Sequence, residues 1–160
     1  MHFMKIELTP NKIVKDATTI WNAQGPAVDI VMDLKNLTFK ENSIDMIYSF
    51  HVLDHLFLEE IPAVLNNWVK CLKPGGDLFL IVDDFEYVCR AFVGGDINIE
   101  QFNMEFCHSA QLDRDLLTKL LTQAGFKESK MVIWFDNIPN AFTKKHFDLV
   151  ISGKKDEQIA

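Results

Sequence analysis

The segment 77–82, Asp-Leu-Phe-Leu-Ile-Val, constrains the fold of this chain more than any other part of the sequence. A run that is apolar almost throughout is typical of a central parallel strand, because such a strand is buried on both faces. In the preceding segment, 59–72, apolar residues recur with the period of an α-helix. The turn residues Pro74-Gly75-Gly76 separate the two segments, so the sequence predicts a helix that leads into a buried strand.

Strand and helix patterns alternate along the remainder of the chain. A second helix is predicted from its N-cap, Asp113, to Ala124, and Gly125 has the residue type expected just after a helix end. A first helix of at most about two turns fits within 10–16. The other predicted strands are 5–8, 17–21, 28–32, 45–50, 131–135 and 146–152. This alternation is typical of an α/β domain built around a mainly parallel sheet.

Length and charge limit the domain count and the partners. The 160 residues contain no repeat or linker, so one domain is expected over 1–153, followed by a polar tail over 154–160. The 16 Lys and Arg residues against 23 Asp and Glu residues leave a net charge of −7, which disfavours a nucleic-acid partner. The chain has no apolar run of the roughly 20 residues that span a bilayer and no signal-peptide pattern. We therefore expect a cytoplasmic protein without a membrane partner.

Three segments carry a family pattern in the same order as the family has it. In the first, over 28–56, the pair Asp33-Leu34 follows a strand, and Ser49-Phe50-His51-Val52-Leu53-Asp54-His55-Leu56 ends the next one. The second is Leu72-Lys73-Pro74-Gly75-Gly76, and the third runs from His108 to the Ala-Gly-Phe at 124–126. Together they resemble the class I S-adenosylmethionine (SAM)-dependent methyltransferases, most closely the small-molecule group often called type 11.

This resemblance implies a Rossmann-like fold with an antiparallel last strand, SAM as the cofactor and a small molecule as the methyl acceptor. It implies that Asp33 accepts a hydrogen bond from the adenine amino group and that Leu34 packs beside the ring. Ser49 and Phe50 would lie where cofactor and substrate meet. Thr9 and Asn22 follow the first and second strands, where the family has two further cofactor contacts.

The chain departs from the family pattern at those two contacts. The family has a glycine-rich loop after the first strand, but the first glycine of this chain is Gly25. The second strand ends at Asn22 rather than at the acid that binds the ribose hydroxyls. Three interpretations stay open: an enzyme with a reworked cofactor site, an inactive methyltransferase-like protein that acts through binding or oligomerisation, and a truncated gene product.

Three side chains are candidates for the chemistry of a methyl transfer. His51, at the end of a predicted strand, could accept a proton from a hydroxyl acceptor, or it could cap the next helix. Asp84 follows the central strand together with Asp83, and either acid could orient a substrate or simply begin a helix. His108 is the third candidate, and a purely structural role is its alternative.

Two further interpretations of the sequence concern metal sites and partner proteins. His51 and His55, with Asp54 between them, resemble a shortened zinc-hydrolase motif, but no third ligand is evident in the sequence. The three cysteines are spaced 18 residues apart, which is not a metal-ligand spacing, so no metal site is expected. The segments 85–92 and 102–106 are rich in phenylalanine and could form a substrate lid or the face of a homodimer.

Overall fold

β5 (Leu72–Asp83) lies inside the sheet, as the apolar run predicts, between β4 (Ile44–Phe50) and β7 (Asp148–Lys155). The computed structural model describes residues 3–131 and 148–157. The sheet has seven strands in the order β3-β2-β1-β4-β5-β7-β6. Its remaining strands are β1 (Lys5–Leu8), β2 (Thr18–Trp21), β3 (Ile30–Val31) and β6 (Phe126–Met131).

The strand directions agree with the predicted fold class. β1 pairs in parallel with both β2 and β4, and β4 pairs in parallel with β5. β7 is antiparallel to β5 and to β6. The prediction of a mainly parallel α/β sheet with an antiparallel last strand is therefore confirmed. Because β1, β4 and β5 run in one direction, their carboxyl ends meet at one edge, where open α/β sheets bind ligands.

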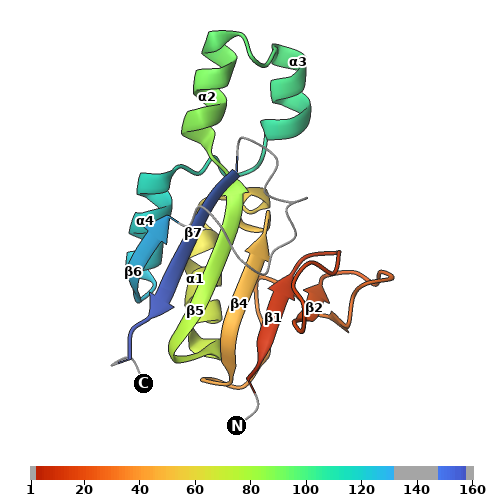
Figure 1. Cartoon of the computed structure of the whole chain (residues 1–160), viewed down its shortest axis with the longest axis vertical. Coiled ribbons are helices and arrows are strands. Elements are labelled where there is room, and N and C mark those ends of the chain that lie inside the picture. Colours follow the sequence, from red (N-terminus) through yellow and green to blue (C-terminus); the bar gives the residue numbers. More distant parts are fainter. Residues whose placement is uncertain (1–2, 132–147, 158–160) are drawn as a thin grey trace.

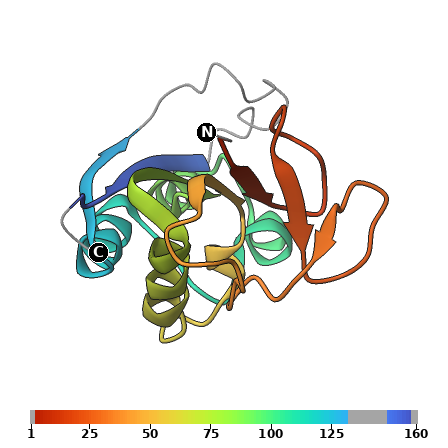
Figure 2. The same cartoon turned by 90° about the horizontal axis from the view of Figure 1, so that it is seen from below.

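Helices occupy two positions around this sheet. α1 (Ile61–Cys71) and α4 (Arg114–Gln123) lie on the same face (Figure 2). α2 (Phe85–Gly94) and α3 (Ile99–Gln101) project beyond the carboxyl end of β5 (Figure 1). Two shorter segments complete the list: the 3-10 turn η1 (Leu53–His55) and the π-helical turn η2 (Phe102–Phe106). Among the described residues, no helix has both the length and the apolar character needed to cross a membrane.

The main core lies between the sheet and the face that carries α1 and α4. Ile6, Ile47 and Leu80 of the sheet are fully buried there, together with Leu65 and Trp68 of α1. A fully buried apolar side chain of this size contributes about 1.5–3 kcal/mol. The α1 pattern read from the sequence therefore marks the face that the helix buries.

The structure differs from the predicted elements at both ends of the chain. No helix forms within 10–16; the segment is irregular, and Ile13 and Val14 are buried against the second face of the sheet. β6 begins at Phe126, directly after α4, whereas the predicted strand 131–135 falls outside the described residues except for Met131. β7 continues to Lys155, two residues into the expected tail, because the Lys155 ammonium group donates to the backbone oxygen of Leu72 and to Asn42 Oδ1.

The Pro-Gly-Gly segment is a wide bulge inside β5 rather than a free turn. Leu72 already pairs with Ile44, and the next pair is Asp77 with Met46, so β5 inserts extra residues at this point. Gly75 has a φ of +73°, a backbone conformation that glycine adopts without strain. A Cβ at Gly76 would lie 2.9 Å from the backbone oxygen of Lys73. The bulge therefore needs glycine for both conformation and space.

Replacing Gly76 by alanine is expected to destabilise the protein by about 1–3 kcal/mol, because the new methyl group meets backbone atoms that cannot move freely. Urea unfolding followed by circular dichroism measures the change. Gly94→Ala is the matched control. Gly94 ends α2, and a Cβ there would meet Asp96 Oδ2 at 3.7 Å, an ordinary contact distance, so its replacement should be neutral or stabilising by less than about 1 kcal/mol. Equal effects of the two substitutions would contradict the steric argument.

Candidate functional site

A cavity of about 620 Å³ opens at the carboxyl ends of β1 to β4. Its volume falls within the range of about 300–1,000 Å³ that is usual for small-molecule and cofactor sites. The lining comes from four segments that follow successive strands: 9–11, 21–22, 33–35, and the residues Phe50, His51, Val52, His55 and Leu56. The parallel sheet thus gathers side chains from distant parts of the sequence around one space.

Most of the residues that the family resemblance links to the cofactor line this cavity. Thr9, Asn22, Asp33, Leu34 and Phe50 are all part of the lining. Ser49 is not: it is a buried residue within β4, paired with Leu8 of β1 and with Leu80 of β5. Of the two residues expected at the end of β4, only Phe50 therefore lines the cavity.

Helix α1 holds the loop that carries Asp33 and Leu34. The indole Nε1 of Trp68 donates a hydrogen bond of 2.8 Å to the backbone oxygen of Leu34. Asn67 holds Leu37, three residues after Leu34, since its side chain accepts from the backbone N–H of Leu37 and donates to the backbone oxygen of Leu37. The Asp33 Oδ1 atom accepts from the backbone N–H of Lys35 at 2.9 Å, which closes a local turn. The loop is therefore ordered before any ligand binds.

The buried side chain of Glu7 holds the segment that stands in place of the glycine-rich loop. Glu7 lies in β1 and is fully buried. Its carboxylate accepts hydrogen bonds from the backbone N–H groups of Ile13 and Val14 and from the Thr19 hydroxyl, the shortest of them 2.6 Å long. These bonds tie the irregular segment after β1 to the start of β2. Our sequence analysis missed Glu7, although a charged residue inside a short strand next to Leu8 is itself a signal.

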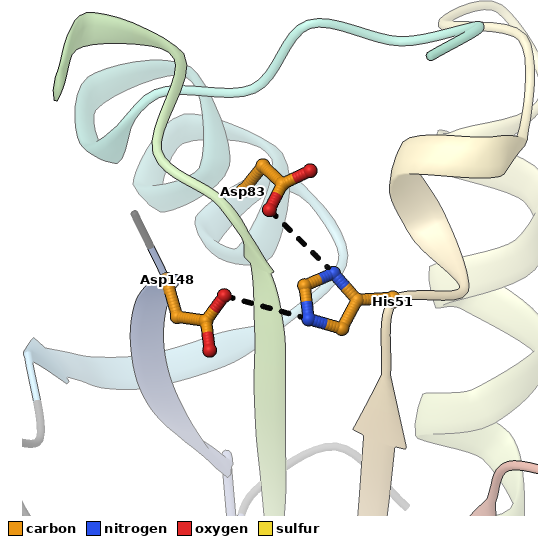
Figure 3. A group of neighbouring side chains, drawn as sticks. All are labelled: His51, Asp83 and Asp148. Carbon is orange, nitrogen blue, oxygen red and sulfur yellow. Dashed lines mark ion pairs between the residues drawn. The ribbon is translucent and has the colours of Figure 1, made fainter. Parts of the chain in front are cut away.

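His51 occupies a strained position directly after β4. Its φ is +49°, which is uncommon for a residue other than glycine, and strained backbone of this kind clusters at active sites. The imidazole lies between carboxylates from neighbouring strands (Figure 3). Nδ1 lies 3.0 Å from Asp54 Oδ2 and 3.9 Å from Asp83 Oδ1, and Nε2 lies 3.5 Å from Asp148 Oδ1. The ring is therefore fixed in orientation at the edge of the cavity.

The carboxylates determine the protonation of this histidine. Burial disfavours the charged imidazole, but the hydrogen bond to Asp54 and the charges of Asp54, Asp148 and Asp83 outweigh it and raise the pKa of His51. Burial also disfavours ionisation of Asp54, yet the hydrogen bond from His51 and the nearby histidines hold the pKa of that carboxyl below its ordinary value. An ionised Asp54 can only accept, so His51 carries its proton on Nδ1.

The other two catalytic candidates lie in different settings. His108 Nε2 is 2.7 Å from Asp83 Oδ2, so His108 joins the group of charged side chains around His51 through a shared carboxylate. Asp84 does not join it, because its side chain accepts from the backbone N–H of Tyr87 and caps α2. Of the two acids after the central strand, the one that faces His51 is Asp83. Asp148 also belongs to this group, and nothing in its local sequence indicated so.

Comparison with family models identifies the chain. A methyltransferase-domain family, Methyltransf_11, matches residues 2–80, which is about half of the chain. The matched region contains β1 to β4, α1 and all the segments that line the cavity. Over these residues the chain belongs to the methyltransferase-domain family. No curated protein matches it by sequence.

Solved structures of methyltransferases share the fold of this chain. A possible histamine N-methyltransferase from Thermotoga maritima has a TM-score of 0.66 and 15% identity, with 98% of this chain and 83% of that one covered. A putative methyltransferase in complex with the Trm112 activator, from Haloferax volcanii, has a TM-score of 0.60 and 13% identity, with 88% and 72% covered. The CurJ carbon methyltransferase has a TM-score of 0.56 and 13% identity, and this chain covers 49% of its length and aligns over 97% of its own.

Replacing Glu7 by glutamine is expected to destabilise the protein by about 1–3 kcal/mol, because one accepting oxygen becomes an NH2 donor and the remaining buried hydrogen bonds lose their charged acceptor. Urea unfolding measures the loss. Glu59→Gln is the control, since Glu59 is exposed, and it should change the stability by less than about 0.5 kcal/mol. A Glu7→Gln variant as stable as the control would show that the carboxylate does not hold this segment.

Proposed function

We propose that this member of the family binds SAM in the 620 Å³ cavity and methylates a small molecule there. The observation that carries the proposal is the coincidence of two independent findings. The cavity lies at the ligand-binding edge of the sheet, and its lining contains Thr9, Asn22, Asp33, Leu34 and Phe50, which the family resemblance links to the cofactor.

The residues that line the cavity offer different hydrogen-bond partners to the adenine and to the ribose of such a cofactor. The loop with Asp33 and Leu34 offers a carboxylate and an apolar side chain for the adenine, and Trp68 holds it in place. Asn22 offers the ribose hydroxyls a neutral amide, which forms weaker hydrogen bonds than a carboxylate does. The family has flexible glycine residues after β1. Here the Glu7 carboxylate in β1 instead holds the backbone of Ile13 and Val14 by hydrogen bonds. We expect recognition to come mainly from the adenine side.

His51 is the residue we assign to the acceptor. When bound, SAM supplies an electrophilic methyl group, and the transfer needs the acceptor held in line with it. His51 borders the cavity, and Asp54 accepts from Nδ1, so we assign Nε2, which lies 3.5 Å from Asp148 Oδ1, as the atom that takes a proton from a hydroxyl acceptor when the imidazole is neutral. His108 acts on His51 only through Asp83, so we assign it a positioning role. Asp84 is not part of the proposed site, because it caps α2.

The helices beyond β5 supply the remaining part of the proposal. Val93 of α2 is 86% exposed and Met104 of η2 is 78% exposed, which is unusual for apolar side chains of this size. The position of α2 and α3 beyond the carboxyl end of β5 is consistent with a lid over an acceptor or with a contact face of a homodimer (Figure 1).

Calorimetric titration with SAM and with its demethylated product tests the cofactor site. We expect saturable binding, and Asp33→Ala should weaken it about 10- to 100-fold, because a charged hydrogen-bond acceptor is lost. Asp115→Ala, at an exposed position in the first turn of α4, is the control and should bind as the unmodified protein does. Absence of heat at millimolar SAM would reject the enzyme and favour the catalytically inactive binding module.

Replacing His51 by glutamine tests the assignment of the proton acceptor. With a hydroxyl-bearing acceptor, kcat should fall about 10²- to 10⁴-fold, while the dissociation constant for SAM changes less than about threefold. His55→Gln is the matched control at the same cavity, four residues along the chain. Equal losses of kcat in the two variants, or a loss of SAM binding in His51→Gln, would contradict the assignment.

A further inference from the structure

Several carboxylates and imidazoles lie close together around His51, beside the cavity. Asp54 follows β4, Asp83 ends β5, and His108 precedes α4. One ligand atom from each of these three side chains lies within 4.8 Å of the others, and His108 Nε2 is 2.7 Å from Asp83 Oδ2. In the sequence, the neighbouring residues His51, Asp54 and His55 indicate at most two metal ligands and an acid. The fold brings the further ligands from distant segments.

This group carries more negative charge than its partners balance. The side chains of Asp54 and Asp83 are 2% and 12% exposed. Within the described part of the chain, the ion-pair partners of these two acids are the histidines His51 and His108. In the described part of the chain no lysine or arginine lies within ion-pair distance of either acid, so two buried carboxylates have only imidazoles as partners.

One oxygen of Asp54 points independently to a missing ligand. Asp54 Oδ2 is bonded to His51 Nδ1, but Oδ1 is buried and has no hydrogen-bond partner among the described residues. A buried charged oxygen without a partner costs at least about 1–3 kcal/mol. Asp54 also belongs to the group with Asp83 and His108, so a cation held by these three side chains would balance their charge and could take the Asp54 Oδ1 atom as a ligand.

We propose that Asp54, Asp83 and His108 bind a divalent first-row transition-metal cation. Bonds of about 2.0–2.2 Å place two ligands of one ion roughly 2.8–4.4 Å apart, which small side-chain rotations reach from the observed spacing. One imidazole and two carboxylates suit Mn²⁺, Fe²⁺ or Zn²⁺, whereas Mg²⁺ and Ca²⁺ prefer oxygen ligands alone. His51 then becomes an outer partner that orients the coordinating Asp54. The inference does not depend on methyl transfer.

Calorimetric titration of the full chain, freed of metal by a chelator, with Mn²⁺, Zn²⁺ and Mg²⁺ tests this site. We expect one Mn²⁺ or Zn²⁺ per chain with a micromolar or tighter dissociation constant, and weaker binding of Mg²⁺. Asp83→Asn should weaken the transition metals at least about 100-fold, because a direct ligand is lost. Asp77→Asn is the matched control, since Asp77 lies near the other end of β5 and pairs with Lys154.

A second variant protects the test from a folding defect. If circular dichroism shows that Asp83→Asn is unfolded, His108→Ala removes another ligand, from the irregular connection before α4, and should give the same loss of affinity. Absence of transition-metal binding by the unmodified chain would overturn the proposal. So would binding that neither variant weakens, or a preference for Mg²⁺. This experiment measures metal binding only. A failure of the chain to bind SAM would therefore reject the proposed function without affecting the proposed metal site.

Discussion

The pairing of β5 with both of its neighbours is the constraint on which the site depends. β4 is parallel to β5, with Phe50 opposite Ile81, so the two strands end together and bring His51 close to Asp83. β7 is antiparallel, so its first residue, Asp148, lies opposite Asp83 at the same edge. One register therefore decides which charged side chains meet, and a shift by one residue would turn them to the other face.

In the first part of the chain, a buried side chain rather than glycine fixes the backbone after β1. A glycine-rich loop adopts its conformation because glycine tolerates it, whereas here the buried carboxylate of Glu7 holds the backbone of Ile13 and Val14 directly. The cost is dependence on one side chain, since those N–H donors have no other acceptor in the segment. The result is a fixed backbone next to Thr9, Pro10 and Asn11, which line the cavity.

Periodic segments were predictable, and segments whose structure rests on distant contacts were not. α1, α4 and the parallel strands follow from apolar patterns, and Asp113 caps α4 as expected. The helix expected within 10–16 is absent, because Glu7 supplies hydrogen bonds that compete with helical ones. β6 and the end of β7 were missed because their sequences are rich in lysine. Lys155 is nevertheless buried, with its ammonium group bonded to Leu72 and Asn42.

The sequence by itself determined the fold class, the family resemblance and most of the cavity lining, because these depend on local patterns and on motifs that stay together along the chain. Only the tertiary structure decided which acid after β5 faces His51, that Asp148 and His108 share its surroundings, and that one oxygen of Asp54 is left without a partner. Those relations join residues from 25 to almost 100 positions apart, and strand register rather than spacing along the chain brings them together.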